Sequence, residues 1–157
     1  MSSEEETKGA SFNYQRRVHF HETDMAGIMH FSNFFRLMEE TEHAFFRSLG
    51  FSIHHEFDGV EVGWPRVKAT CDYLKPLKYE DELEIVLKVV EIREKSLHYV
   101  FDFNKCMEGQ WMLAARGELT AVCVRFIEDD TGKHHRKFTS APIPAAIKTR
   151  LQQASSI

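Results

Sequence analysis

Residues 24–49 join a loop rich in reactive side chains to a long amphipathic helix, and they read DMAGIMHFSNFFRLMEETEHAFFRSL. In the second part of this segment, apolar side chains recur at every third or fourth position, which is the spacing of a helix that buries one face. The positions on this face are Phe34, Leu37, Met38, Thr41, Phe45 and Leu49. Ser32 or Asn33 can cap the start of the helix, and Gly50 suits the position just after its end.

Alternation of apolar and polar side chains dominates outside the helix, and it is typical of strands with one buried face. It predicts strands at residues 12–20, 60–73, 83–89, 97–103 and 111–126, followed by a short helix at 145–152. Pro65 marks an edge or a bulge within the second strand. The small residues Ala115, Gly117 and Ala121 share one face of the last strand and would let a helix approach closely.

The order of these elements predicts an α+β fold, in which a curved antiparallel sheet of about five strands wraps around the long helix. The open edges of such a sheet invite pairing between copies, so at least a dimer is expected. Residues 1–11 are expected to form a disordered tail, which leaves a single domain at residues 12–157.

The composition excludes several classes of protein. The 157 residues carry 20 Lys and Arg against 24 Asp and Glu, a net charge of −4, which argues against binding to nucleic acid. No apolar run approaches the ~20 residues needed to span a bilayer, and the polar start is unlike a signal peptide. The three cysteines form no CxxC pair. A cytoplasmic protein with reduced thiols and no disulfide framework is therefore expected.

The loop before the helix holds the densest set of reactive side chains, among them Asp24 and His30. A helix N-terminus presents unpaired N–H groups and partial positive charge. These donors can polarise a carbonyl and hold the developing oxyanion, while a nearby carboxylate attacks the carbonyl or activates water. Asp24 is therefore a candidate nucleophile or base for an acyl-transfer reaction.

Other interpretations of the charged residues remain open. Asp24 can be a turn residue that bonds its own backbone. His19 and His21 share one face of a strand, but histidines so placed are usually surface groups, and no metal site is expected.

The segment from Asp24 to Phe35 resembles the signature of the 4-hydroxybenzoyl-CoA thioesterase family of hotdog-fold acyl-CoA thioesterases. The shared features are the aspartate, a glycine three residues later, an apolar pair, and an asparagine followed by an aromatic residue. Weaker matches at residues 72–83 and 92–96 follow in the same order. The resemblance therefore covers about residues 12–144.

This resemblance implies a hotdog fold and a role for several residues. Asp24 matches the catalytic aspartate, and Phe31 matches the residue whose backbone N–H polarises the thioester carbonyl. His30 lies one residue before the place where the family often has histidine. The implied substrate-binding residues are Gly27, Ile28, Asn33, Phe34, Glu39 and Trp64, and the implied CoA-binding residues are Arg93, Lys95 and Ser96. Local positive charge for the CoA phosphates is also present at Arg136 and Lys137.

The implied activity is hydrolysis of a small or medium acyl-CoA, aromatic or aliphatic, with Asp24 as base or as nucleophile. Another hotdog branch that resembles this one places its carboxylate on the helix, so Glu39 or Glu42 can replace Asp24 as the catalytic carboxylate. Coenzyme A is then part of the substrate and no further cofactor is expected. A homodimer or a dimer of dimers is expected, with the site between subunits. Two alternatives remain: a hydratase or dehydratase of acyl thioesters that uses Asp24 and His30 as an acid–base pair, and a hotdog protein that binds acyl-CoA without turnover.

Overall fold

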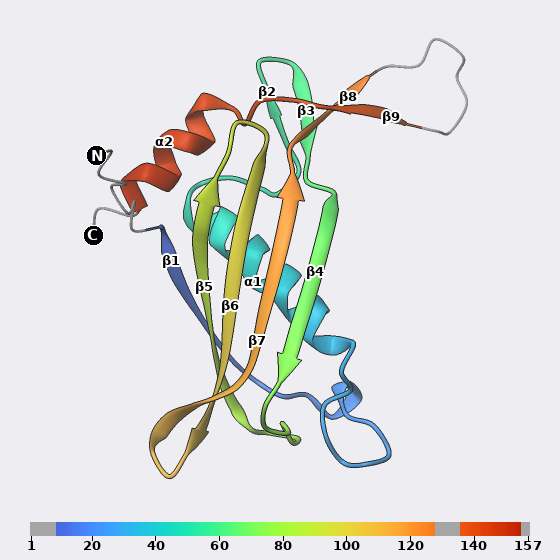
Figure 1. The fold of residues 1–157 in the computed structure, drawn as a ribbon, viewed down its shortest axis with the longest axis vertical. Helices are drawn as coiled ribbons and strands as arrows, with labels where there is room; N and C mark the ends of the chain where they lie inside the picture. Colours follow the sequence, from blue (N-terminus) through green and yellow to red (C-terminus); the bar gives the residue numbers. More distant parts are fainter. Residues whose placement is uncertain (1–8, 128–135, 155–157) are drawn as a thin grey trace, which may run out of the picture.

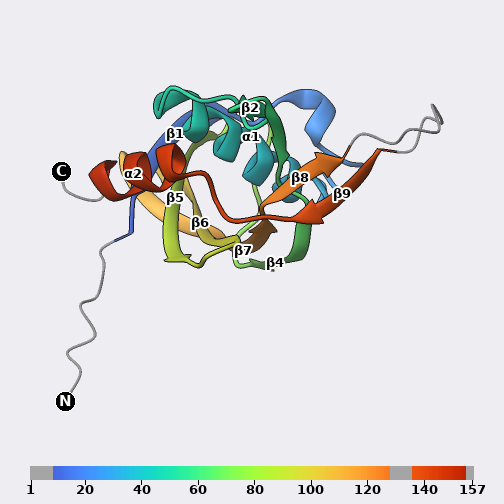
Figure 2. The same cartoon turned by 90° about the horizontal axis from the view of Figure 1, so that it is seen from above.

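A five-stranded antiparallel sheet and one long helix form the body of the protein (Figure 1). The computed structural model describes residues 9–127 and 136–154. In chain order the elements are β1 Ser11–Arg17, the 3₁₀ turn η1 Phe20–Glu22, α1 Asn33–Ser48, β2 His55–Phe57, β3 Val60–Gly63, β4 Arg66–Tyr73, β5 Glu82–Ile92, β6 Ser96–Met107, β7 Gln110–Val122, β8 Val124–Ile127, β9 Lys137–Ser140 and α2 Ala145–Ala154. The strand order of the main sheet is β1-β5-β6-β7-β4. Figure 2 shows the sheet curving around α1, as the element order predicted.

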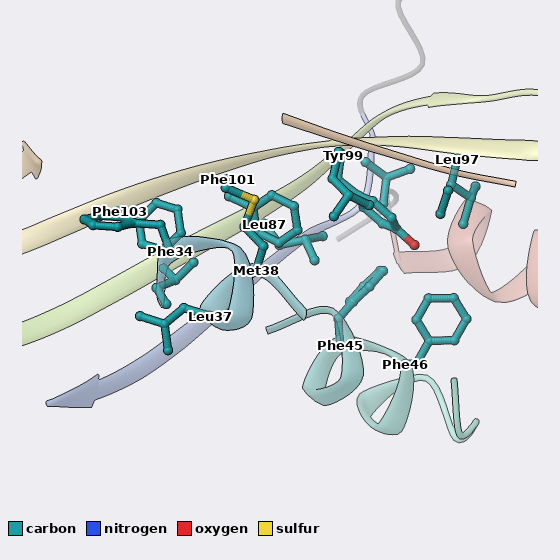
Figure 3. Close-up of a cluster of buried hydrophobic side chains, with 14 of the residues drawn as sticks. Phe34, Leu37, Met38, Phe45, Phe46, Leu87, Leu97, Tyr99, Phe101 and Phe103 are labelled. Atoms are coloured by element: carbon teal, nitrogen blue, oxygen red, sulfur yellow. The ribbon is translucent and has the colours of Figure 1, made fainter. Parts of the chain in front are cut away.

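The core lies between α1 and the face of the sheet that it covers. The apolar stripe of α1 meets the inward side chains of β5 and β6 (Figure 3). These buried residues are Phe34, Leu37, Met38, Phe45 and Phe46 from the helix, and Leu87, Leu97, Tyr99, Phe101 and Phe103 from the strands. A Cβ atom added at Gly117 would lie 2.0 Å from Cε of Met38. The close approach that the small residues of this strand predicted is therefore confirmed.

Two of the predicted strands are each divided into two. The segment 60–73 breaks around Pro65, which has no N–H to donate, into β3 and β4, and the segment 111–126 breaks at Cys123 into β7 and β8. The Cys123 N–H leaves the sheet ladder and donates to the carbonyl of Lys95 at 2.7 Å. Of these four strands, β4 and β7 stay in the main sheet, while β3 and β8 join a second sheet of order β2-β3-β8-β9, which the sequence pattern did not predict.

The N-terminal part of the chain also differs from the prediction. Ala10 is 1% exposed and its carbonyl accepts the N–H of Val89 at 2.9 Å, and β1 begins at Ser11. Residues 9–11 therefore belong to the folded domain instead of the predicted tail, whereas residues 1–8 lie outside the described part. The first strand ends at Arg17, and η1 takes up the end of the predicted segment 12–20.

One edge of the main sheet is formed by β4, which pairs with β7 on one side only. Most of its side chains are exposed, including Val67 at 63% and Tyr73 at 45%. This edge of the sheet therefore combines unpaired backbone groups with exposed apolar side chains. None of the helices in the described residues has the length and apolar character needed to cross a bilayer.

Candidate functional site

Asp24 lies in a compact loop between η1 and α1. The Asp24 N–H donates to the carbonyl of Ile28 at 2.9 Å, and the Gly27 N–H donates to the carbonyl of Asp24 at 3.0 Å. Gly27 has a φ of +78°, a backbone conformation that residues with a Cβ rarely adopt, so glycine fits this turn. Oδ1 of Asp24 accepts the N–H of Ala26 at 2.8 Å. The other carboxylate oxygen has no hydrogen-bond partner among the described residues, so Asp24 is both a turn residue and an available carboxylate.

A cavity of about 340 Å³ opens beside this carboxylate. Four of the predicted site residues line it together: Asp24, Ile28, Phe31 and Phe34. The opposite wall is formed by the end of β4 and the residues after it, including Tyr73 and Lys75. The sequence pattern gave these two residues no role, although the weaker family match at residues 72–83 includes both of them.

The backbone of Phe31 is held at the rim of this cavity. Its carbonyl accepts the hydroxyl of Tyr73 at 3.1 Å and the N–H of Phe34 at 3.4 Å. Burial raises the pKa of Tyr73, and the neighbouring Cys71 raises it further, so the phenol stays protonated and donates at neutral pH. The N–H of Phe31 donates to no group within residues 9–127 and 136–154, and it is therefore available to a ligand.

The His30 side chain contacts its sequence neighbours and not the Asp24 cavity. Its Nδ1 lies 2.7 Å from Oγ of Ser32, and its ring stacks on Phe31 with centroids 4.5 Å apart. His30 is absent from the residues that line the Asp24 cavity. Ser32 precedes the first residue of α1, as predicted, but its hydroxyl faces His30 and makes no capping hydrogen bond.

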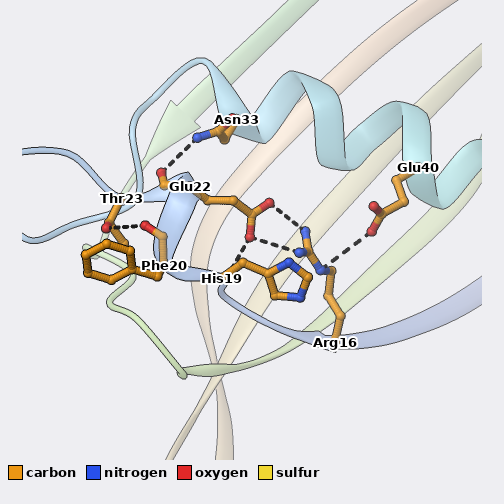
Figure 4. A network of polar contacts seen from close by, with 7 residues as sticks. All are labelled: Arg16, His19, Phe20, Glu22, Thr23, Asn33 and Glu40. Carbon is orange, nitrogen blue, oxygen red and sulfur yellow. Dashed lines mark hydrogen bonds and ion pairs between the residues drawn. The ribbon is translucent and has the colours of Figure 1, made fainter.

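Asn33 supports the loop from the start of α1. Its side-chain amide donates to the carbonyl of Glu22 at 2.8 Å (Figure 4). The N–H of His30 donates to the same carbonyl at 2.9 Å. Asn33 and Gly27 thus shape the loop that carries Asp24, and neither of them lines the cavity.

Two predicted substrate-binding residues, Glu39 and Trp64, lie in a second cavity of about 430 Å³. Its walls include Phe126, Phe138 and Arg66. This cavity lies at the other end of β4 from Asp24, because Arg66 begins the strand that Tyr73 ends. The single chain therefore separates the predicted substrate-binding residues into two groups.

Arg66 joins this second cavity to a buried carboxylate. Its Nη2 lies 2.5 Å from Oε1 of Glu42, and its Nη1 donates to the carbonyl of Trp64 at 2.8 Å. Glu42 is fully buried. Burial raises the pKa of the Glu42 carboxyl, and the charge and hydrogen bond of Arg66 oppose this rise without cancelling it. Glu42 lines neither cavity, so its position is that of a structural ion-pair partner.

Of the predicted CoA-binding residues, Arg93 and Lys95 lie in the turn between β5 and β6 and Ser96 begins β6, at the opposite end of the main sheet from the Asp24 loop (Figure 1). The Arg93 side chain donates to Glu91 at 2.8 Å. Along β6, Phe103 contacts Phe34 and lies seven positions after Ser96, a distance of roughly 23 Å at the usual rise of a strand. One chain therefore does not bring Arg93, Lys95 and Ser96 together with Asp24.

Arg136, His19 and His21 make local contacts. Arg136 pairs with Glu61, and its guanidinium lies 4.7 Å from the centre of the Phe126 ring. The rings of His19 and His21 lie 5.4 Å apart. Across the described ranges, no three His, Cys, Asp or Glu side chains are grouped as a metal ion would require.

Comparison with known proteins places this geometry in a family. The model of the thioesterase-like superfamily matches residues 18–151. A 1,4-dihydroxy-2-naphthoyl-CoA hydrolase of Trichodesmium erythraeum is 30% identical over 115 residues, which cover 73% of this chain and 82% of that protein. A putative esterase of Aquifex aeolicus is 46% identical over 82 residues, which cover 52% of this chain and 62% of the esterase. The chain thus spans less than two thirds of that esterase.

A solved structure shares the fold. The 4-hydroxybenzoyl-CoA thioesterase of Pseudomonas sp. strain CBS-3 superposes with a TM-score of 0.71 at 22% identity, covering 88% of this chain and 98% of that one. The strand order, the helix that the sheet surrounds and the match over residues 18–151 agree with one another. The chain therefore belongs to the thioesterase-like superfamily and has its hotdog fold.

Proposed function

We propose that this protein is an acyl-CoA thioesterase that uses Asp24 as its catalytic carboxylate. The observation that carries the proposal is the pairing of two groups at one cavity: the free oxygen of Asp24 and the unpaired N–H of Phe31. A carboxylate and a backbone donor that belong to one small cavity are the groups that acyl transfer requires. The names of the relatives, which include CoA hydrolases, support the same reaction.

In this mechanism the thioester carbonyl oxygen accepts the Phe31 N–H, which stabilises the negative charge that develops there. Asp24 removes a proton from water as the water oxygen adds to the carbonyl carbon. The carbon–sulfur bond then breaks, and the thiolate takes the proton to give CoA thiol and a free acid. Alternatively, an Asp24 oxygen attacks the carbonyl carbon, the carbon–sulfur bond breaks and CoA thiolate leaves, which gives a mixed anhydride. Water then hydrolyses the anhydride, restoring the Asp24 carboxylate and releasing the free acid, while one proton of the water passes to the thiolate. The Tyr73 hydroxyl donates to the Phe31 carbonyl and so helps to hold the backbone of this residue for either route.

The proposal includes a homodimer formed through β4. Antiparallel pairing of two β4 strands about a two-fold axis places the Arg66 end of one strand beside the Tyr73 end of the other. The cavity with Glu39 and Trp64 would then adjoin the Asp24 cavity of the partner. The turn with Arg93, Lys95 and Ser96 would lie at the same end. Such a dimer accounts for the separation of the predicted site residues within one chain.

The second cavity favours an aromatic acyl group. Trp64, Phe126 and Phe138 line it, and flat aromatic walls suit a ring that stacks or packs edge to face. The exposed carboxylate of Glu39 provides a hydrogen-bond acceptor there. Two of the compared proteins are named for hydroxylated aromatic acyl-CoA substrates. We therefore propose an aromatic acyl-CoA as the substrate.

No observation favours the hydratase alternative, because His30 bonds Ser32 and does not line the Asp24 cavity.

The test of the proposed thioesterase activity is release of free thiol from a panel of aromatic and aliphatic acyl-CoAs. Turnover of aromatic members with loss of activity in Asp24→Asn supports the proposal. Binding of acyl-CoA in a thermal-shift assay with no turnover of any member would make this a binding protein. Asp58→Asn, in the exposed turn between β2 and β3, is the control.

A further inference from the structure

The loop that carries Asp24 closes at Glu22. The Glu22 carbonyl accepts the N–H of His30 at 2.9 Å and the side-chain amide of Asn33 at 2.8 Å. An isolated antiparallel bridge joins Thr23 to Met29 just inside this closure. The positions of Thr23 and Asp24 therefore depend on the position of Glu22.

The Glu22 side chain is fixed by Arg16 on β1 (Figure 4). Nη1 and Nη2 of Arg16 donate to the two carboxylate oxygens at 2.9 and 2.8 Å. The N–H of His19 donates to Oε1 of Glu22 at 2.8 Å. Nε of Arg16 also lies 3.5 Å from a carboxylate oxygen of Glu40 on α1. Arg16 thus connects the sheet, the Asp24 loop and the helix.

This ion pair is far more enclosed than the neighbouring one on the same strand. The Arg16 and Glu22 side chains are each 9% exposed, whereas those of Arg17 and Glu82, also 2.8 Å apart, are 61% and 51% exposed. Bidentate pairs with little exposure hold their geometry, while exposed pairs rearrange at small cost. Burial alone would raise the pKa of Glu22, but the hydrogen bonds from Arg16 and His19 and the charge of Arg16 leave it lowered. The pair therefore stays charged at neutral pH.

We propose that Arg16 and Glu22 form a positioning pair that fixes the Asp24 carboxylate relative to the Phe31 N–H. The inference rests on the proposed thioesterase function. Neither residue lines the Asp24 cavity, so the pair acts through the loop and not on the substrate. Asp24 is two residues from Glu22, and Phe31 follows directly after His30, whose N–H is bonded to Glu22. Both reacting groups are thus placed from the same anchor.

The test compares Glu22→Gln with Glu82→Gln, which removes the same charge from the exposed pair. Misplacement of a catalytic group by about 1 Å can cost on the order of 100-fold in rate. Glu22→Gln is expected to lower kcat by roughly 10- to 100-fold with KM changed less than about 3-fold, because substrate contacts remain. Glu82→Gln is expected to leave both parameters unchanged. Circular dichroism and melting curves check that both variants fold.

Two further measurements separate positioning from general stability. In Arg16→Gly, millimolar guanidinium should restore part of the lost kcat, and the same addition should not change Arg17→Gly. Amide hydrogen exchange at Asp24, Ala26 and Gly27 should be faster in Glu22→Gln than in Glu82→Gln. Folded Glu22→Gln with wild-type kcat, or with unchanged exchange in the loop, would overturn the proposal. If the wild-type protein hydrolyses no acyl-CoA, the proposed function fails, and hydrogen exchange still reports whether the pair orders the loop.

Discussion

Removing Arg66 while leaving Glu42 in place should destabilise the protein strongly. Glu42 is fully buried, and the Arg66 guanidinium is its ion-pair partner at 2.5 Å. Its other oxygen, Oε2, has no hydrogen bond in the described part of the chain. In Arg66→Met the carboxylate would keep its burial and lose its counter-charge. Breaking a buried pair on one side typically costs about 3–5 kcal/mol, which corresponds to a fall in Tm of about 6–20 °C for a chain of this size.

The pH dependence of the same variant provides a second signature. The pKa of Glu42 in the folded protein lies above its ordinary value, chiefly because of burial, and loss of Arg66 would raise it further. The folded protein then holds this proton more tightly than the unfolded chain does. Stability therefore falls as pH rises from the unfolded pKa to the folded pKa. The Tm deficit of Arg66→Met should be smaller at pH 5 than at pH 8.

The assay is thermal unfolding at fixed protein concentration, followed by circular dichroism, because dimerisation would make Tm depend on concentration. The double variant Arg66→Met with Glu42→Leu removes both charges and should regain most of the lost stability. Arg17→Met, which breaks the exposed pair with Glu82, should change stability by less than about 1 kcal/mol. A Tm unchanged in Arg66→Met, or a double variant no more stable than the single one, would refute this reasoning.

Two further predictions concern the site. Tyr73→Phe removes the hydroxyl that donates to the Phe31 carbonyl. Because this hydrogen bond is exposed, stability should fall by only about 0.5–1.5 kcal/mol, while kcat should fall more than KM rises. An unchanged kcat would contradict the supporting role of Tyr73. In the second test, equal amounts of unfolded Asp24→Asn and Trp64→Ala are mixed and refolded together. If each site takes Asp24 from one protomer and Trp64 from its partner, half of the dimers are mixed and hold one intact site each, so about one quarter of wild-type activity should return. No recovery from mixed dimers would place both residues of a site in one protomer.

The fold was predictable where local pattern and tertiary packing agree. The helix beginning at Asn33 has a periodic apolar face and ends before Gly50, whose φ is +89°. The small residue Gly117 indicated where the helix approaches the sheet. The second sheet was missed because alternation continues through the breaks at Pro65 and Cys123. At these points the chain changes partners, and only long-range pairing determines which strand comes next.

The site was predictable to the extent that it is local in the sequence. Asp24, Phe31 and Phe34 lie within eleven residues and line one cavity. Tyr73 reaches the same cavity only because β4 pairs with β7 in the observed register. Trp64 lies in the other cavity, and in the proposed dimer it would approach the partner's Asp24 loop only through pairing between chains, which local sequence does not specify. Local sequence therefore predicts the reactive loop, but the opposite wall of its cavity follows from tertiary structure.

The most direct test of the thioesterase proposal is a comparison of binding and turnover in Asp24→Asn. The substitution keeps the size of the side chain and its bond to the Ala26 N–H, so the loop should keep its shape. With an aromatic acyl-CoA that the wild-type protein hydrolyses, the variant should bind with a Kd within about 3-fold of the wild-type value. Its kcat should fall by at least ~100-fold, because the carboxylate that attacks or activates water is gone. A folded Asp24→Asn that releases thiol at the wild-type rate would contradict the account.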